Sequence, residues 1–479
     1  MRNGATAQPR RDWEYVEGWG MSAGSEARVI RPRCADELAE ALGEAREDGV
    51  KLAPRGTGCS YGDASLQSDG RVLDLTQMNK VISFDPETGV LEAEGGLTIE
   101  GAWRHILSSG WWPYVVSGTM YPTLGGAAAM NIHGKNNFRV GTFGDHIREF
   151  DIVLPSGELR TANREQNSDL FYAAIGGFGS LGVFSRLVMD TKRVHSGLMK
   201  VRGVSTHDLA EMMAVFEEEK ATADYLVGWV DAFPGGDNAG RGLVHVGRNL
   251  APGEDLDPAA SLDPAGQSLP ANILGVIPKS EMWRGLRMFN HDMGMRFVNA
   301  VKYQAGRLEG MGDAYLQTHA AFHFLLDYVP NWKWAYGRQE RSGLIQYQVF
   351  LPDQTAHDTL LELLERCRVR KHVSYLGVLK RHKPDPFWLT HSLDGWSLAL
   401  DFKVDEGRRD SLLEHCHDLT ELVLAAGGKF YFAKDSVLRP EDVQRFLPRE
   451  QLEAFKALKL ELDPEGLFTT DLMRRVFSA

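Results

Sequence analysis

Hydrophobic and polar residues follow one pattern along the first part of this chain and a different pattern after about Thr191. In the first part, short apolar strands alternate with helices and glycine-rich turns. Two apolar runs, Val81–Phe84 and Val90–Ala93, are separated by turn residues and predict a β-hairpin. The segment from Ile99 to Leu107 is predicted to be helical.

Strand–helix–strand units fill the region between Thr191 and about Gly428. The first unit runs from Leu198 to Val230, and the last runs from Leu398 to Phe432. Strands with helices gathered on one face predict an α+β domain. Residues 251–271 are rich in Pro, Asp, Gly and Ala, which predicts a mobile surface loop within this second domain.

The composition limits the class of protein. The chain has 479 residues, 43% of them hydrophobic, which is enough for more than one domain core. Its formal net charge of −12 argues against nucleic acid as the main partner, because phosphate backbones are bound by basic surfaces. Four cysteines without a C-x-x-C spacing predict a reducing compartment rather than a disulfide framework.

Neither a membrane anchor nor a metal site is expected. No apolar run approaches the ~20 residues that span a bilayer. Arg10-Arg11 would suit an export signal, but no apolar stretch follows, so we expect a cytoplasmic protein. His319 and His323 have the spacing of zinc ligands on a helix, yet Ala320 stands where a glutamate usually follows the first histidine.

The first of three glycine-rich clusters follows a predicted strand at Leu52-Ala53. Glycines there let the backbone approach a ligand closely and turn its N–H groups toward an anion such as a pyrophosphate. A tight turn without a ligand explains these residues equally well, and the spacing fits neither the nucleotide P-loop nor a dinucleotide fingerprint. The cluster comprises Arg55, Gly56, Thr57, Gly58, Cys59, Ser60, Tyr61 and Gly62.

Small residues dominate the second and third clusters. A structural helix rarely holds two adjacent glycines beside a His-Gly-Lys-Asn run, so the second cluster is typical of a wall pressed against a large cofactor. Glycines between apolar segments in the third cluster again indicate close backbone approach. The positions concerned are Gly118, Thr119, Thr123, Gly125, Gly126, Ile132, His133, Gly134, Lys135 and Asn136 in the second cluster, and Gly179, Gly182 and Val183 in the third.

These three clusters, in this order, resemble the FAD-binding domain of the vanillyl-alcohol-oxidase-type flavoproteins. Further matches over nearly the whole chain resemble one family among them, the decaprenylphosphoryl-ribose 2′-oxidases. They include Thr142–His146, Gln346–Gln348, Asp401-Phe402 and Tyr431–Ser436. The order of so many matches makes the resemblance specific.

The resemblance implies a two-domain α+β fold of the PCMH type. Residues 1–195 and 429–479 would form a discontinuous FAD-binding domain, and residues 196–428 would form an inserted substrate or cap domain with an antiparallel sheet. The cofactor would be FAD, held by the three clusters and Tyr431. Many relatives bond the flavin covalently to a histidine at the position of Cys59, whereas this family holds FAD without a bond, so we expect non-covalent FAD. The alternative is a flavin thioether to Cys59.

Oxidation of a hydroxyl by flavin requires a base for the hydroxyl proton and a positive charge that stabilises the reduced flavin. Lys434 lies between Tyr431 and Asp435, where the chain returns into the cofactor domain, and a desolvated lysine loses its proton near neutral pH. We therefore predict Lys434 as the base or substrate-binding cation, with His133 and Tyr61 beside it. The alternative for Lys434 is a surface ion pair with Asp435.

The substrate is expected to contact residues from both domains. Lys135 would bind an anionic group, and alternation along a strand places Gln346 and Gln348 on one face, where they would bind sugar hydroxyls. The alternatives are a solvated lysine and a polar outer face. Ser397 and Ala399 stand where the resemblance would place an asparagine and a cysteine beside the substrate pocket. Trp332, Trp334 and Tyr347 either line the pocket or belong to the core.

The sequence thus predicts an FAD-dependent oxidoreductase that oxidises a secondary hydroxyl of a sugar or a polyprenylphosphoryl pentose. One alternative is an alditol or aldonolactone oxidase, and another is a flavin-binding protein without turnover. The resemblance also implies a partner NAD(P)H reductase that completes an epimerisation. A lipid-linked substrate would bring the protein to the periphery of the membrane.

Overall fold

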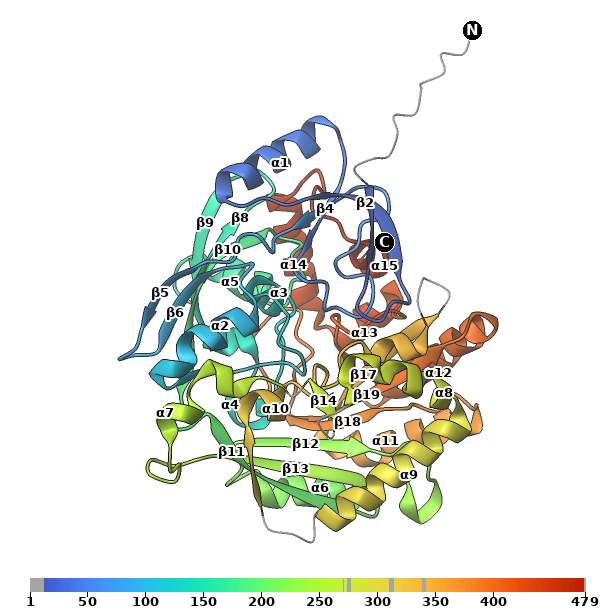
Figure 1. Cartoon of the computed structure of the whole chain (residues 1–479). Coiled ribbons are helices and arrows are strands. Elements are labelled where there is room, and N and C mark those ends of the chain that lie inside the picture. Colours follow the sequence, from blue (N-terminus) through green and yellow to red (C-terminus); the bar gives the residue numbers. More distant parts are fainter. Residues whose placement is uncertain (1–12, 270, 274–276, 310–313, 338–341, 478–479) are drawn as a thin grey trace.

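A computed structural model describes residues 13–269, 271–273, 277–309, 314–337 and 342–477 (Figure 1). Arg10 and Arg11 lie outside these residues. The first part of the chain begins with a four-stranded sheet in the order β1-β2-β4-β3, in which β2, β4 and β3 are parallel. Its elements are β1 (Trp13–Glu17), β2 (Gly24–Ile30), α1 (Ala35–Glu47), β3 (Leu52–Arg55) and β4 (Arg71–Asp74).

A second sheet of antiparallel strands follows, in the order β5-β6-β10-β8-β9, with β7 also pairing β10. The predicted hairpin is confirmed as β5 and β6, and the predicted helix as α2. The strands are β5 (Val81–Asp85), β6 (Val90–Glu94), β7 (Trp111–Pro113), β8 (Ile147–Val153), β9 (Leu159–Asn163) and β10 (Val183–Arg193). The helices are α2 (Ile99–Ile106), α3 (Leu124–Ala129), α4 (Asn137–Val140) and α5 (Ser168–Ala174).

The middle of the chain builds an eight-stranded antiparallel sheet, called the cap sheet below, in the order β16-β11-β13-β12-β18-β19-β17-β20. Its strands are β11 (Leu198–Thr206), β12 (Tyr225–Val230), β13 (Gly242–Asn249), β16 (Tyr315–Thr318), β17 (Gly343–Pro352), β18 (Gly377–His382), β19 (Gly395–Val404) and β20 (Lys429–Phe430). The antiparallel character agrees with the predicted fold class.

Three helices pack against the cap sheet and against one another: α6 (Leu209–Glu219), α11 (Asp353–Val369) and α12 (Arg409–Ala425). Tyr347 on β17 points toward them, since its hydroxyl lies 3.1 Å from Thr420 Oγ1 on α12. Because side chains alternate along a strand, the neighbours Gln346 and Gln348 point to the opposite face. The helices α8 (Met282–Phe289), α9 (Asp292–Glu309) and α10 (His319–His323) complete this part of the chain.

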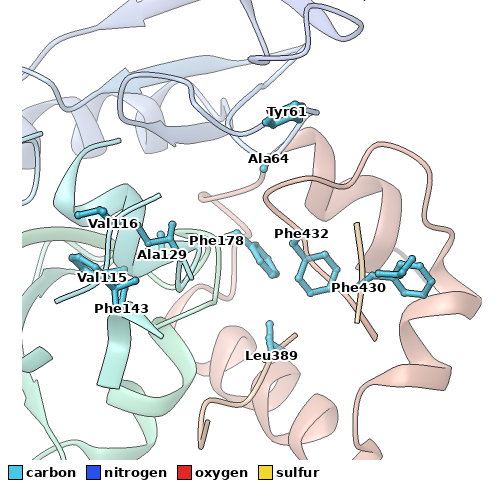
Figure 2. Packing of buried hydrophobic residues seen from close by; sticks show 14 of the residues in the cluster. Tyr61, Ala64, Val115, Val116, Ala129, Phe143, Phe178, Leu389, Phe430 and Phe432 are labelled. Atoms are coloured by element: carbon cyan, nitrogen blue, oxygen red, sulfur yellow. The ribbon is translucent and has the colours of Figure 1, made fainter. Parts of the chain in front are cut away.

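The last helices pack back onto the first part of the chain. They are α13 (Pro440–Phe446), α14 (Arg449–Leu462) and α15 (Asp471–Phe477), drawn in red beside the blue strands in Figure 1. Leu52 N–H donates to Leu467 O, and Tyr61 N–H donates to Ala433 O. Figure 2 shows Phe178 of the third glycine cluster beside Phe432, with 5.3 Å between the ring centroids.

The predicted surface loop over residues 251–271 is exposed for most of its length, as expected, but it contains short helices that were not predicted. Residue 270 lies outside the described residues, but the segment contains α7 (Pro258–Ser261) and a 3-10 helix at Pro264–Gln267. The buried Gln267 side chain donates to Gly197 O and accepts from the N–H of Ala320. Aspartate side chains cap these short helices by accepting from the N–H groups of Ala260 and Ala265. Because aspartates are also common in loops, the composition alone did not predict the helices. A short hairpin, β14 (Asn272–Ile273) and β15 (Ile277–Pro278), follows.

Among the described residues, no helix has both the length and the apolar character that crossing a bilayer requires.

Candidate active site

Most of the predicted site residues line one cavity of about 620 Å³ between the glycine-rich clusters and the cap sheet. The first part of the chain contributes Arg55, Gly56, Thr57, Gly58, Cys59, Ser60, Tyr61, Gly118, Thr119, Thr123, Gly125, Gly126, Ile132, His133, Lys135, Gly179, Gly182 and Val183. The cap sheet contributes Gln346, Gln348 and Ala399, and the return segment contributes Tyr431 and Lys434. Residues far apart in the sequence therefore share one site.

The glycine-rich wall has the close backbone packing that a large cofactor requires. A Cβ at Gly56 would lie 2.3 Å from Thr123 Oγ1, so a glycine lets the first cluster touch the start of α3. Gly58 and Gly179 have φ of +73° and +76°, which glycine adopts without strain. Arg55 fixes the loop by donating to Ser65 Oγ and Glu17 O at 3.0 and 2.8 Å. These residues fit a bound FAD along the wall.

Lys434 lies in the cavity against Tyr61 and Asp401 rather than on the surface. Its Nζ stands 3.7 Å from the centroid of the Tyr61 ring. Burial lowers the pKa of Lys434 to about 7, and the Asp401 carboxylate opposes this shift. Burial also raises the pKa of Asp401 to about 6, against the effects of Gln346 and Lys434. Both groups therefore titrate near neutral pH.

Gln346 joins Tyr61 to Asp401. Its Nε2 donates to Tyr61 Oη at 3.3 Å and to Asp401 Oδ1 at 2.5 Å. The bridge follows from strand register, because Gln346 lies opposite Asp401 across β17 and β19. The second carboxylate oxygen, Asp401 Oδ2, has no hydrogen-bond partner among the described residues. Asp401 does not line the cavity, so it acts on the site through Gln346 and through its charge on Lys434.

His133 is held between Gln348 and Lys380. Its Nε2 lies 3.0 Å from Gln348 Nε2, and its Nδ1 lies 3.4 Å from Lys380 Nζ. Burial, followed by the charge of Lys380, lowers the pKa of His133 well below its usual value. The ring is therefore a neutral hydrogen-bonding group at neutral pH, and His382 and His391 pack beside it.

Lys135 ties the second cluster to the cap. Its buried Nζ donates to Phe322 O and, at 3.1 Å, to His323 O. Burial lowers the pKa of Lys135 well below its usual value. Lys135 lines the cavity, so it can face a substrate while the two carbonyls hold its amine in place.

Four predicted site residues do not line the cavity: Gly62, Gly134, Asn136 and Ser397. A Cβ on Gly62 would lie 2.2 Å from Asp435 O, and one on Gly134 would lie 2.5 Å from Asn136 Oδ1. Asn136 donates its side-chain amide to Tyr114 O at 2.8 Å. Ser397 is fully buried, with its Oγ 2.7 Å from His382 Nε2. These residues support the cavity wall through contacts on the side that faces away from the cavity.

Lys380, Asp401 and Trp19 belong to the site although the sequence did not predict them there. Lys380 lines the cavity, and burial lowers its pKa to about 8. Asp401 stood out in the sequence only as part of a motif that resembles the ribose oxidases. The Trp19 ring lies 4.6 Å from the Tyr61 ring and 5.6 Å from the Trp332 ring, between centroids. Both lie in strands that carry further charged residues, Arg381 beside Lys380 and Lys403 after Asp401, so charge within the strand did not single them out.

The candidate aromatic and histidine residues divide between the pocket and the core. Trp332 lines the cavity, whereas Trp334 packs against Trp283 and Tyr347 faces α12. The rings of His319 and His323 stack on Trp112, with centroids 5.0 and 5.8 Å away. Both histidines are buried, and His323 also lines the cavity.

Cys59 lines the cavity as a protonated thiol. Its Sγ lies 3.4 Å from Thr57 Oγ1, and burial raises its pKa above the usual value. The thiolate is the reactive form of cysteine, so this environment disfavours attack on a flavin.

Comparisons with known proteins agree with the geometry of the site. Residues 27–163 match the model of an FAD binding domain. The chain is 28% identical to decaprenylphosphoryl-β-D-ribose oxidase of Mycolicibacterium smegmatis over 476 residues, which cover 96% of each chain. It is 29% identical to cytokinin dehydrogenase 3 of Arabidopsis thaliana over 141 residues, 28% of this chain and 26% of the relative. It is 25% identical to D-lactate dehydrogenase of Anaerostipes hadrus over 168 residues, 34% and 35% of the two chains.

The matched domain spans the first glycine-rich cluster and the second, and the match to the ribose oxidase extends through the cap sheet and the return segment that carries Lys434. The cavity between these parts has the wall and the polar groups that a flavin and its substrate require. The protein is an FAD-dependent oxidoreductase, with an FAD-binding domain and a resemblance to decaprenylphosphoryl-β-D-ribose oxidase along nearly its whole length.

Proposed function

We propose that the enzyme oxidises a secondary hydroxyl of a sugar, with a polyprenylphosphoryl pentose oxidised at its 2′ carbon as the leading substrate. The observation that carries the proposal is the buried cluster of Lys434, Tyr61 and Gln346 at the cavity wall, with Asp401 hydrogen-bonded to Gln346 outside the cavity lining. The full-length similarity to decaprenylphosphoryl-β-D-ribose oxidase supports the same substrate class.

FAD, when bound, supplies the acceptor for the hydride that leaves the hydroxyl-bearing carbon. The neutral amine of Lys434 takes the hydroxyl proton, and the carbon becomes a carbonyl. Asp401 stabilises the ammonium that forms, and Gln346 orients both Asp401 and Tyr61. Gln348 and His133 offer further hydrogen bonds to sugar hydroxyls.

The charge and lining of the cavity favour an anionic substrate with an apolar part. Arg55 lines it, as does Lys380, whose pKa of about 8 leaves it mostly charged at neutral pH, and none of the described residues that line it is an aspartate or a glutamate. Its cap side is largely apolar, with Leu286, Val298 and similar side chains. A phosphate-linked sugar on a prenyl chain matches both properties. In this proposal residues 1–195 and 429–479 hold FAD, and residues 196–428 hold the substrate.

The test of the proposed role is the Lys434→Ala variant. We expect it to retain FAD but to lose the anaerobic rate of flavin reduction by about two to four orders of magnitude, the range for removal of a general base. Stopped-flow absorbance of the flavin measures this rate. Lys456→Ala, which removes a lysine from the surface of α14, is the matched control. Near-normal flavin reduction in Lys434→Ala would remove Lys434 from the mechanism.

The substrate is identified by the same measurement on a panel of compounds. A short-chain prenylphosphoryl ribose should reduce the flavin faster than free alditols or aldonolactones. Faster reduction by an alditol or a lactone would instead assign the enzyme to that second class. Ser397 and Ala399, which stand in place of the asparagine and cysteine expected from the resemblance, are compatible with such a different substrate. If the product is a 2′-keto sugar, an NAD(P)H-dependent reductase is the partner that would complete an epimerisation.

A further inference from the structure

The two faces of helix α9 have different surroundings. One face lines the active-site cavity with Met295, Val298 and Asn299. The opposite face exposes Met293, Phe297 and Val301 at intervals of four residues, with 78, 60 and 52% of each residue accessible. Residues spaced by four lie on one side of a helix, so this is a continuous apolar stripe directed away from the cavity.

The stripe continues onto the end of α8. Met288 and Phe289 are exposed there, and the Phe289 ring is stacked 6.5 Å from the Phe297 ring, between centroids. Figure 1 shows α8 and α9 side by side at one edge of the cap. Leu308 extends the stripe toward the end of α9. We call these six residues, Met288, Phe289, Met293, Phe297, Val301 and Leu308, the α8–α9 face.

The two helices are basic in a protein that is acidic as a whole. Residues 282–309 contain five Lys or Arg and two Asp or Glu, whereas the whole chain carries a formal charge of −12. Arg287, Arg296 and Arg307 are exposed. On a helical wheel, Arg296 and Arg307 fall at the border of the apolar stripe. A basic, amphipathic surface helix is typical of binding to anionic lipid headgroups.

The same two helices lie at the entrance of the cavity. Leu286 of α8 and Val298 of α9 line the cavity, as do Leu325 and Tyr328, which are 53 and 38% exposed. Apolar side chains therefore belong both to the lining of the cavity and to the protein surface. The apolar part of a substrate could lie against them.

We propose that the α8–α9 face binds the surface of an anionic lipid bilayer, with its apolar side chains inserted among the headgroups and its arginines on the phosphates. The docking deepens the proposed function and rests on it, because a lipid-linked sugar would then enter the cavity from the bilayer. An anionic lipid surface attracts the positive helix pair, whereas in a two-fold dimer this face would meet its own positive copy.

The test is sedimentation of the holoenzyme with vesicles of phosphatidylcholine and phosphatidylglycerol, and with vesicles of phosphatidylcholine alone. We expect binding to the mixed vesicles that weakens with added salt, and weaker binding to the neutral ones. The double variant Met293→Ser and Phe297→Ser should bind at least about tenfold more weakly, since each substitution removes an inserted apolar side chain. Arg287→Gln and Arg307→Gln should each weaken binding to the mixed vesicles about fivefold.

Leu460→Ser, which alters an exposed leucine on α14, is the matched control and should bind as the unaltered protein does. Flavin reduction by a water-soluble substrate should be unchanged in all these variants, so a failure of docking is distinct from a failure of the proposed function. Equal vesicle binding by the serine variant would overturn the proposal. A dimer of the unaltered protein that the serine variant dissociates, without vesicle binding, would assign the face to a second copy of the chain.

Discussion

At the residue scale, the chemistry of the site depends on one lysine and one aspartate whose pKa values are brought close together. Burial lowers the pKa of Lys434 to about 7 and raises that of Asp401 to about 6. Lys434 must be neutral to accept a proton, so the rate of flavin reduction should rise as the pH rises through about 7. The apparent midpoint belongs to the pair, because the two groups interact.

Substitution of Asp401 should move this midpoint. The Asp401 carboxylate raises the pKa of Lys434, so Asp401→Asn should lower that pKa further and shift the midpoint to lower pH. The asparagine oxygen can still accept from Gln346, which preserves the hydrogen bond. Stopped-flow flavin reduction as a function of pH measures the shift, and Asp405→Asn at the cap surface is the control. An unchanged or higher midpoint in Asp401→Asn would contradict the coupling.

At the scale of elements, local sequence patterns predicted individual strands and hairpins better than they predicted which distant strands pair in a sheet. The hairpin at Val81–Glu94 is formed by residues near in sequence, so turn residues and alternation were enough to predict it. Gln346 and Gln348 were placed on one strand face for the same reason. Lys380 and Asp401 reach the site through the order β18-β19-β17, which joins strands distant in sequence. Sequence periodicity carries no information on that order, so neither residue was predicted in the site.

The contact between the first cluster and the return segment depends on Gly62. A Cβ there would meet Asp435 O at 2.2 Å and Ser436 Oγ at 2.5 Å. Gly62→Ala should therefore separate the two segments, lower the free energy of unfolding by about 1–3 kcal/mol and weaken FAD binding. Denaturant unfolding and FAD titration measure the two effects.

Gly43→Ala is the matched control for this substitution. Gly43 lies in α1, and a Cβ at this position would have open space within 4 Å. Alanine should therefore stabilise the helix by about 0.5–1 kcal/mol. Equal effects of the two substitutions would mean that the contact at Gly62 is not needed.

At the scale of the whole molecule, the cavity is the place where distant parts of the chain meet. Its walls come from the glycine-rich clusters, the cap sheet and the return segment with Lys434. A cofactor bound there would contact segments hundreds of residues apart, and its binding free energy would add to the stability of the folded protein.

FAD should therefore stabilise the protein in proportion to the logarithm of its free concentration, provided that no covalent bond holds it. At 100 times the dissociation constant the gain is about 2.7 kcal/mol, which raises the melting temperature of the stripped protein as FAD is added. The half-buried, protonated thiol of Cys59 favours this reversible binding. Acid precipitation should leave the yellow colour in the supernatant, and Cys59→Ser should behave alike. Colour retained in the pellet of the unaltered protein, but not of Cys59→Ser, would establish the thioether instead, and the melting temperature would then not depend on added FAD.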